Sequence, residues 1–424
     1  MGNIAKNRSI TQTWFAIALW KRILSAMAIG ALLGSLWGPG AEALGWIGDL
    51  FIRLIRMIVV PLVFVTIVSG VVSMGDPSKL GSLGVKTLLL YMLTTLGAIT
   101  IGLVLAVFLQ PGVGVDLTGA PASTLQETIP LSERLISIVP ENPIAALAEG
   151  NILAIIFFAI LIGVGLLSVG ESGKPVAAFM DASSEVVLRI THWIMEIAPF
   201  GVLALIARVT GAQGFDALLN AVALAITVFI ACAAHLVLTH GVVIMQLMLK
   251  LSPINFFRGA REAMLVAFST SSSAATLPIS MSAAEDNLGV KPVVASTVLP
   301  LGATINMDGT ALYVGIVSVS AAQAFGIDLT LTDYLIMAGT TTLVSVGTAA
   351  VPSASLFLMA AVMETIGMTA QQIAVTVGFI FIIDRPLDML RTSINIAGDL
   401  AVSTAVATWE GEFDREVFDR PLNS

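Results

Sequence analysis

The chain has 424 residues, of which 57% are hydrophobic and only 11% are charged, and its formal net charge is −8. Soluble domains carry roughly 25% charged residues, so this composition excludes a soluble globular protein. The chain has no basic stripe to meet phosphates, which argues against a nucleic-acid partner. Its one cysteine, Cys232, excludes a disulfide framework and is expected to be a small buried hydrophobe.

Apolar runs long enough to cross a bilayer recur along the chain, which predicts a multi-pass protein of the cell (inner) membrane. The first six predicted spans cover 18–37, 45–74, 82–109, 144–169, 184–209 and 216–249. Basic residues precede the first run and favour an inner amino terminus. No small-residue cleavage site interrupts that run, so we expect it to stay in the membrane. The acidic tail, 410–419, is expected to be solvated.

The region 254–410 contains two apolar segments broken by small polar residues, around 269–276 and 345–355. They read AFSTSSSAATLPIS and LVSVGTAAVPSASLF, and each is followed by a longer helix with polar residues at its centre. Paired interruptions of this kind indicate the binding site of a transporter, because irregular backbone at membrane depth is tolerated only inside protein or along a cavity. The simpler alternative is a pair of kinked helices whose serines bond back to carbonyls.

The helix predicted over 371–408 carries one polar stripe. At 100° per residue, its polar side chains fall within an arc of about 100°. They are Asp384, Asp388, Arg391, Thr392, Asn395 and Asp399. Ionisable groups at membrane depth usually face a protein interior and mark a substrate or ion path.

The span predicted over 292–325 contains Asn306, Asp308 and Gly309, which are poor helix formers. If the helix unwinds around Asn306, freed carbonyls and carboxylates can ligate a hard alkali or alkaline-earth cation. The two polar helices also contain more aspartates than arginines. The aspartates are Asp308, Asp384, Asp388 and Asp399, and the arginines are Arg385 and Arg391. Bound cations, a bound ammonium group or a protonated carboxylate would remove this excess.

Three histidines, His192, His235 and His240, have no carboxylate partner at helical spacing, so we expect no proton relay. An intramembrane hydrolase would need a nucleophile with a base, or two histidines and a carboxylate for zinc. Neither pattern is present in the sequence, and the chain is not expected to be an enzyme.

The blocks SSSAATLP, GATINMDGTALY, SVGTAAVP and DMLRTSINIAGD resemble the dicarboxylate/amino-acid:cation symporter family, which contains the glutamate and aspartate transporters. The resemblance runs from about residue 18 to residue 410 and implies an all-α polytopic membrane protein. Eight transmembrane helices and two re-entrant helical hairpins would form an elevator-type transporter, assembled as a homotrimer in the lipid bilayer.

The same resemblance divides the chain into two domains. A scaffold and trimerisation domain would comprise 1–78 and 143–212, and a transport domain would comprise 79–142 and 213–424. Within the transport domain, hairpin 1 would cover 254–288, the seventh span 291–325, hairpin 2 330–368 and the eighth span 371–408.

Each polar group receives a role from the resemblance. Arg391 would hold the side-chain carboxylate of the substrate together with Thr310, and Asp388 would accept its ammonium group beside Thr392. Asn395 and the hairpin 1 residues would hold the α-carboxylate. The remaining members of the substrate set are Ser272, Ser273, Val351 and Ser355. Ser271 stands where some relatives carry an arginine, a charge that Arg385 could supply instead.

Three sodium sites are also implied. The first would use Asp399 with carbonyls of Gly302, Asn306 and Asn395. A second would use Thr304 with carbonyls of Ser345, Val346 and Thr348. The third set comprises Tyr91, Thr94, Thr95, Asn306 and Asp308.

The resulting prediction is a sodium-driven symporter of aspartate or glutamate that works by alternating access. Asp388 favours an amino acid over a dicarboxylate, and Arg391 favours an acidic side chain. A proton-coupled glutamate or C4-dicarboxylate symporter is the first alternative, and an anion-conducting channel is an alternative of another class.

Overall fold

A computed structural model describes residues 19–73, 77–115, 139–213, 216–346 and 355–420, together with Trp14, Ile17 and Ile136. The regular elements in these ranges are helical. Up to residue 248 they are α2 (Leu19–Trp37), α3 (Gly45–Ser73), α4 (Pro77–Leu109), α6 (Pro143–Glu149), α7 (Ile152–Val169), α8 (Lys174–Gln213), α9 (Asp216–His235) and the π-helical segment Leu236–Met248. From there on they are α10 (Pro253–Thr270), α11 (Ser273–Ser282), α12 (Pro292–Ile305), α13 (Asp308–Ala324), α14 (Leu331–Val346), α15 (Ser355–Thr365), α16 (Ala370–Glu410) and α17 (Arg415–Asp419).

Four stretches of the described chain are long and apolar enough to cross a membrane, namely Lys21–Phe51, Leu83–Leu109, Ala154–Ile194 and Ala221–Met248. Shorter apolar helices cover Val60–Val72 and Ala370–Ile380. Helices suit a bilayer because each satisfies its backbone hydrogen bonds internally. The predicted all-helical membrane class is therefore confirmed, whereas the number of eight crossings stays a prediction.

The outward faces of these helices are apolar. Large hydrophobic side chains stand exposed along α4, α8 and the π-helical segment, among them Leu93, Phe108, Phe179 and Leu247. Such continuous exposure would be a liability in water, but lipid tails solvate these side chains as well as a protein core does.

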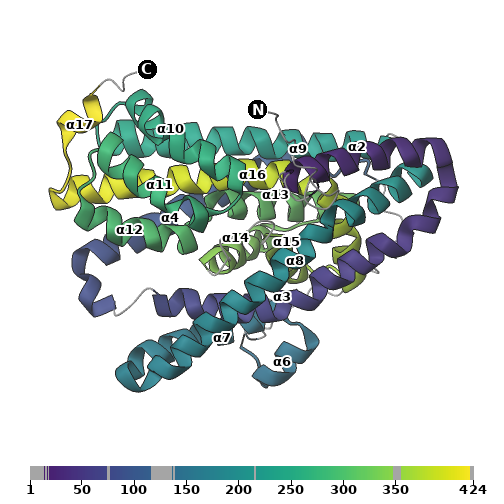
Figure 1. Cartoon of the computed structure of the whole chain (residues 1–424), viewed down its shortest axis with the longest axis horizontal. Helices are drawn as coiled ribbons and strands as arrows, with labels where there is room; N and C mark the ends of the chain where they lie inside the picture. Colours follow the sequence, from purple (N-terminus) through teal and green to yellow (C-terminus); the bar gives the residue numbers. More distant parts are fainter. Residues whose placement is uncertain are drawn as a thin grey trace, which may run out of the picture.

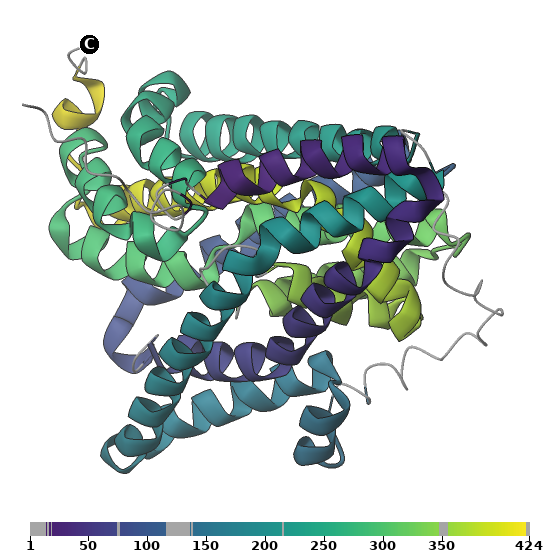
Figure 2. The same cartoon turned by 45° about the vertical axis from the view of Figure 1, so that its right-hand side comes forward.

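The helices pack in two sets (Figure 1). In the first set α2 and α3 lie against α8, and α7 lies against α3. In the second set α16 is central and contacts α4, α9, α10, α12 and α13. Figure 2 shows α2, α3 and α8 crossing in front of this second set, with α6 and α7 at its lower edge. The two sets touch where α8 meets α9 and α16, where α7 meets α14 and α15, and where α2 meets α16, with smaller contacts of α3 to α12 and α15.

The first predicted interruption is confirmed. Helix α10 ends at Thr270, where Ser271 adopts a left-handed conformation with φ of 52°. Ser272 then caps α11, since its Oγ accepts a hydrogen bond from the Ala275 N–H at 3.2 Å. The second predicted interruption, around 345–355, includes residues 347–354, which lie outside the described residues, so it stays a prediction.

The tail after α16 is only partly solvated, which corrects the expectation from its charge. Phe413 pairs with Val290 in an isolated antiparallel bridge, and the Asp414 N–H donates to the Gly289 carbonyl at 2.7 Å. Gly289 has φ of +69°, and a Cβ there would lie 2.1 Å from the Asp414 carbonyl oxygen, so glycine is required. Phe418 is buried. Apolar residues among the acidic ones thus anchor the tail. The prediction from net charge missed them, because it considered only the acidic residues.

Candidate functional site

The predicted unwinding around Asn306 is confirmed. Helix α12 ends at Ile305, Asn306 is extended with φ −89° and ψ 90°, and α13 begins at Asp308. Asn306 and Asp308 are fully buried, so this break lies inside the protein. Backbone carbonyls released from the helical pattern therefore lie beside buried side-chain oxygens, which is the donor chemistry that alkali cations prefer.

One side of the break forms an oxygen-rich cluster with α4. Thr95 Oγ1 donates to Asp308 Oδ1 at 2.8 Å, and Thr94 Oγ1 lies 3.4 Å from the same oxygen. Thr94 Oγ1 is also 3.4 Å from Asn306 Oδ1, and the Tyr91 hydroxyl donates to the Val298 carbonyl at 3.1 Å. The five residues predicted as a third cation set are thus brought together in the buried interior.

A second cluster surrounds Asp399 on α16. Asn306 Nδ2 donates to Asp399 Oδ1 at 2.9 Å and to the Asn395 carbonyl at 3.2 Å. A Cβ at Gly302 would lie 2.5 Å from Asp399 Oδ1 and 2.3 Å from the Tyr91 hydroxyl. The four residues predicted for the first cation set therefore meet, and Gly302 permits the approach.

Asn395 also holds the start of α13. Its Oδ1 accepts a hydrogen bond from the Gly309 N–H at 2.8 Å. A Cβ at Gly309 would lie 2.5 Å from the Arg391 carbonyl oxygen, so α13 touches the backbone of α16 here. Thr310, the next residue, is buried at this contact. The first turn of α13 is therefore placed directly beside Arg391.

Arg391 is fully buried and is surrounded by polar partners from three helices. Its Nη2 donates to Asp384 Oδ1 and Asp388 Oδ1, each at 3.0 Å, and its Nη1 donates to Ser355 Oγ at 2.7 Å. Its guanidinium carbon also lies 3.7 Å from the centroid of the Tyr313 ring. A planar guanidinium held this way can exchange one carboxylate for another without leaving its place.

Asp388 has a second arginine partner besides Arg391, because Arg385 Nη1 lies 3.4 Å from Asp388 Oδ2. Arg385 thus supplies a positive charge to this cluster, whereas its role in place of a hairpin 1 arginine stays a prediction. Thr392 is also buried, and its Oγ1 donates a hydrogen bond to the backbone carbonyl of Asp388 at 2.8 Å. Asp384 completes the group, and the Tyr313 hydroxyl donates to its Oδ1 at 3.1 Å.

The rest of the predicted set is placed less directly. Thr304 Oγ1 donates to the Leu301 carbonyl and Ser345 Oγ to the Thr342 carbonyl, while Val346 ends α14, which contacts α12. Thr348 and Val351 lie outside the described residues. Ser272 and Ser273 sit at the start of α11, which contacts α16. These contacts leave the predicted second cation set and the α-carboxylate roles as predictions.

The expectation that no histidine has a carboxylate partner at helical spacing is wrong for His192. The structure also brings two histidines and a carboxylate together, a set that was not expected from the sequence. His235 Nε2 lies 3.1 Å and His240 Nε2 3.4 Å from Asp308 Oδ2, and all three side chains are fully buried. His192 Nε2 lies 4.0 Å from Glu196, four residues further along the exposed side of α8. Helical spacing within one segment could not reveal Asp308, because it belongs to another helix.

Charge is distributed unevenly across the site. Asp384 and Asp388 pair with Arg385 and Arg391, so that part is balanced. In the described residues, no lysine or arginine forms an ion pair with Asp308 or Asp399. The excess negative charge expected from the sequence is therefore concentrated in the two oxygen-rich clusters. A buried carboxylate without a counter-charge is costly, which favours a bound cation here.

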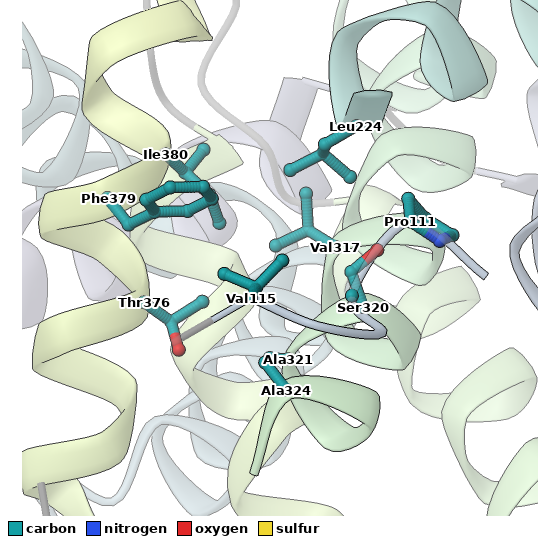
Figure 3. A pocket seen from close by; sticks show the side chains of 11 residues that line it. Pro111, Val115, Leu224, Val317, Ser320, Ala321, Ala324, Thr376, Phe379 and Ile380 are labelled. Atoms are coloured by element: carbon teal, nitrogen blue, oxygen red, sulfur yellow. The ribbon is translucent and has the colours of Figure 1, made fainter. Parts of the chain in front are cut away.

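A cavity elsewhere in the protein has a different character (Figure 3). It lies between the end of α4 and helices α9, α13 and α16, and its walls include Val115, Leu224, Val317, Phe379 and Ile380. Its polar side chains are the hydroxyls of Ser320 and Thr376, and none of its lining residues carries a charge. This cavity does not suit an ionic substrate.

Sequence reasoning did not assign Tyr313, Asp384, His235 or His240 to the site. Tyr313 stands three residues after Thr310, so helical spacing could have placed both on one face of α13. Asp384 belongs to the polar stripe that the sequence identified. For the histidines no comparable signal existed.

The helices of the described residues, the apolar exterior and a buried, charge-bearing polar centre are those of a multi-pass membrane transporter. The family model for the sodium:dicarboxylate symporter family matches residues 19–409. The chain therefore belongs to the sodium:dicarboxylate symporter family.

Curated relatives align over nearly the whole chain. A proton/glutamate-aspartate symporter of Bacillus subtilis (strain 168) is 36% identical over 399 residues, which are 92% of this chain and 95% of the relative. A proton/sodium-glutamate symport protein of the same organism is 35% identical over 405 residues, 93% of each chain. A C4-dicarboxylate transport protein of Anaeromyxobacter sp. (strain K) is 32% identical over 409 residues, 94% of this chain and 91% of the relative.

Proposed function

We propose that this protein is a sodium-driven symporter of an acidic amino acid, aspartate or glutamate. The observation that carries the proposal is Arg391, buried between Asp384 and Asp388. The two oxygen-rich clusters beside it contain Asp308 and Asp399, which form no ion pair with a lysine or arginine of the described residues. The names of two relatives, which refer to glutamate or to glutamate and aspartate, agree with this substrate class.

Substrate binding would proceed by exchange at Arg391. The side-chain carboxylate of the substrate takes the place of Asp384 or Asp388 on the guanidinium, which keeps the buried arginine paired throughout. The ammonium group of the substrate then neutralises Asp388. A C4-dicarboxylate brings two carboxylates and no ammonium group, so it would leave Asp388 facing added negative charge. This difference favours an amino acid over a dicarboxylate.

Cation coupling follows from charge. The two arginines and the two aspartates around Arg391 balance one another, but an acidic amino acid adds one negative charge to those of Asp308 and Asp399. Three monovalent cations would balance these three charges. Sodium suits the oxygen donors at the α12–α13 break. Cation binding and substrate binding would then each lower the cost of the other, which is the thermodynamic basis of symport.

A proton-coupled symporter is the second candidate. The observation that favours it is the pair His235 and His240 beside Asp308, since imidazoles can carry a proton next to a carboxylate that sodium would otherwise occupy. The names of these relatives include proton coupling as well as sodium coupling.

For alternating access we propose that α4 and α9–α17 move as a transport domain against a scaffold of α2, α3 and α6–α8, in a homotrimer. The packing of the helices in two sets with limited contact between them supports this division. Ser355 links α15 to Arg391, so hairpin 2 would sense the state of the substrate site and serve as its gate.

Uptake of radiolabelled aspartate into proteoliposomes, with sodium and proton gradients imposed separately, tests the proposal. We expect uptake under the sodium gradient alone, and competition by glutamate that exceeds competition by succinate. Undiminished uptake under a proton gradient with choline in place of sodium would favour the second candidate. Stronger competition by succinate would refute the amino-acid assignment.

A further inference from the structure

Two buried histidines lie together on one side of the chain because of a change in helix type. His235 ends α9, and His240 lies in the π-helical segment Leu236–Met248. In an α-helix, residues five apart point about 140° away from each other. The π-helix bonds residue i to residue i+5 and so brings such residues onto one face. The ring centroids are 4.7 Å apart as a result.

Both imidazoles converge on one carboxylate oxygen. His235 Nε2 is 3.1 Å and His240 Nε2 is 3.4 Å from Asp308 Oδ2, and the candidate ligand atoms lie within 4.8 Å of one another. Zinc bonded to nitrogen and oxygen at about 2.0–2.1 Å in a tetrahedron separates its ligands by about 3.3 Å. The two measured separations match the edges of such a tetrahedron.

The surroundings of both rings are those of metal ligands. Thr239 Oγ1 lies 3.0 Å from His235 Nδ1, and an oxygen at the far ring nitrogen is what usually orients a metal-bound histidine. Neither ring nitrogen of His240 makes a hydrogen bond with any described residue, although the ring is fully buried. A buried imidazole whose Nε2 faces a carboxylate and whose Nδ1 has no partner among the described residues has lone pairs that can ligate an ion.

A purely structural role explains only part of this arrangement. His235 can donate from Nε2 to Asp308 and stabilise its charge at 3.1 Å. The same role accounts less well for His240, because its Nε2 lies 3.4 Å from Asp308 Oδ2 and its Nδ1 has no hydrogen-bond partner among the described residues. A metal ion uses the lone pairs of both rings and the carboxylate together.

We propose that His235, His240 and Asp308 form a binding site for a divalent transition-metal ion of the Zn²⁺ class. Two imidazoles and one carboxylate suit such an ion and do not suit an alkali cation. Asp308 then has two functions, because its Oδ1 contacts Thr94 and Thr95 while its Oδ2 contacts the histidines. A divalent ion on one oxygen repels a sodium ion on the other, a consequence that rests on the proposed function.

Cobalt titration of the purified, metal-stripped, full-length protein tests the site. We expect saturable binding of Co²⁺ with visible absorption bands typical of nitrogen ligation, displaced by Zn²⁺. His240→Ala should weaken this binding by more than about tenfold, because even removal of a group that only orients a metal ligand costs about 10–100-fold. His192→Ala is the matched control, since this exposed histidine of α8 contacts Glu196 and should leave binding unchanged.

Wild-type protein without saturable Co²⁺ binding, or His240→Ala protein that binds like the wild type, would overturn the site. If His240→Ala unfolds, His240→Gln keeps a polar side chain there and gives the same comparison. Aspartate-dependent thermal stabilisation of metal-free protein tests the proposed function separately. Sodium, compared with choline at equal ionic strength, should lower the affinity for Zn²⁺. An affinity that ignores sodium would refute the competition, whatever the histidine variants show.

Discussion

Gly302→Ala tests the arrangement of the cation clusters with the addition of a single methyl group. In the structure that methyl carbon would lie 2.3 Å from the Tyr91 hydroxyl and 2.5 Å from Asp399 Oδ1. Both partners are fully buried, so they cannot move into solvent. The substitution must displace the two oxygens that define the clusters.

The magnitude follows from the cost of overpacking. An extra methyl group in a well-packed interior costs about 1–3 kcal/mol, whereas alanine in place of glycine within a helix would otherwise gain about 0.5–1 kcal/mol. If bound sodium depends on these oxygens, a loss of 1–3 kcal/mol of binding free energy weakens sodium affinity by about 5- to 150-fold. We expect the sodium dependence of aspartate uptake, and of thermal stability, to shift by a factor in this range.

Gly315→Ala is the matched control, because a methyl carbon at this buried position of α13 would lie at an ordinary 3.4 Å from Leu103 Cδ2. Its sodium dependence should equal that of the wild type. Unchanged sodium dependence in Gly302→Ala would refute the assignment of Tyr91 and Asp399 to a cation site. Equal losses in both variants would point to a general effect of packing.

Three further substitutions test other parts of the site. Arg391→Ala should abolish binding of acidic substrates. It should also destabilise the protein by about 3–5 kcal/mol, because it leaves buried carboxylates without their partner. Unchanged aspartate affinity in calorimetry would contradict the assignment. Asp388→Ser should shift competition in uptake from amino acids toward dicarboxylates, and retained amino-acid selectivity would speak against its ammonium role. Thr95→Ala removes the 2.8 Å hydrogen bond to Asp308. This loss of about 1.5 kcal/mol should weaken sodium affinity by about tenfold. Thr100→Ala is the control, because Thr100 is exposed on the same helix and its loss should leave sodium affinity unchanged.

Local sequence was sufficient for the helices and for the break at Asn306. Poor helix formers inside an apolar span predicted that α12 would end there, and backbone propensity acts over a few residues. The polar stripe of α16 was also predicted correctly, because the helical period of the hydrophobic residues determines which face of a helix turns inward. All of its members are buried, as the pattern required.

The details of pairing could not be read in this way. Arg391 lies against the Tyr313 ring and bonds Ser355, and these partners come from α13 and α15, far away in the chain. The resemblance supplied roles for single residues but did not say which side chains bond one another. In the structure Asp384 and Asp388 themselves bond the guanidinium.

By itself the sequence determined that this is a helical membrane protein with a charged interior, because composition and period follow directly from the order of residues. It also located the excess of aspartate over arginine. Only the tertiary structure placed Asp308 beside Thr95, His235 and His240, whereas the arginines pair with aspartates of their own helix. Charges interact over a few ångströms of space, and the residues that meet there are separated by tens to hundreds of positions along the chain.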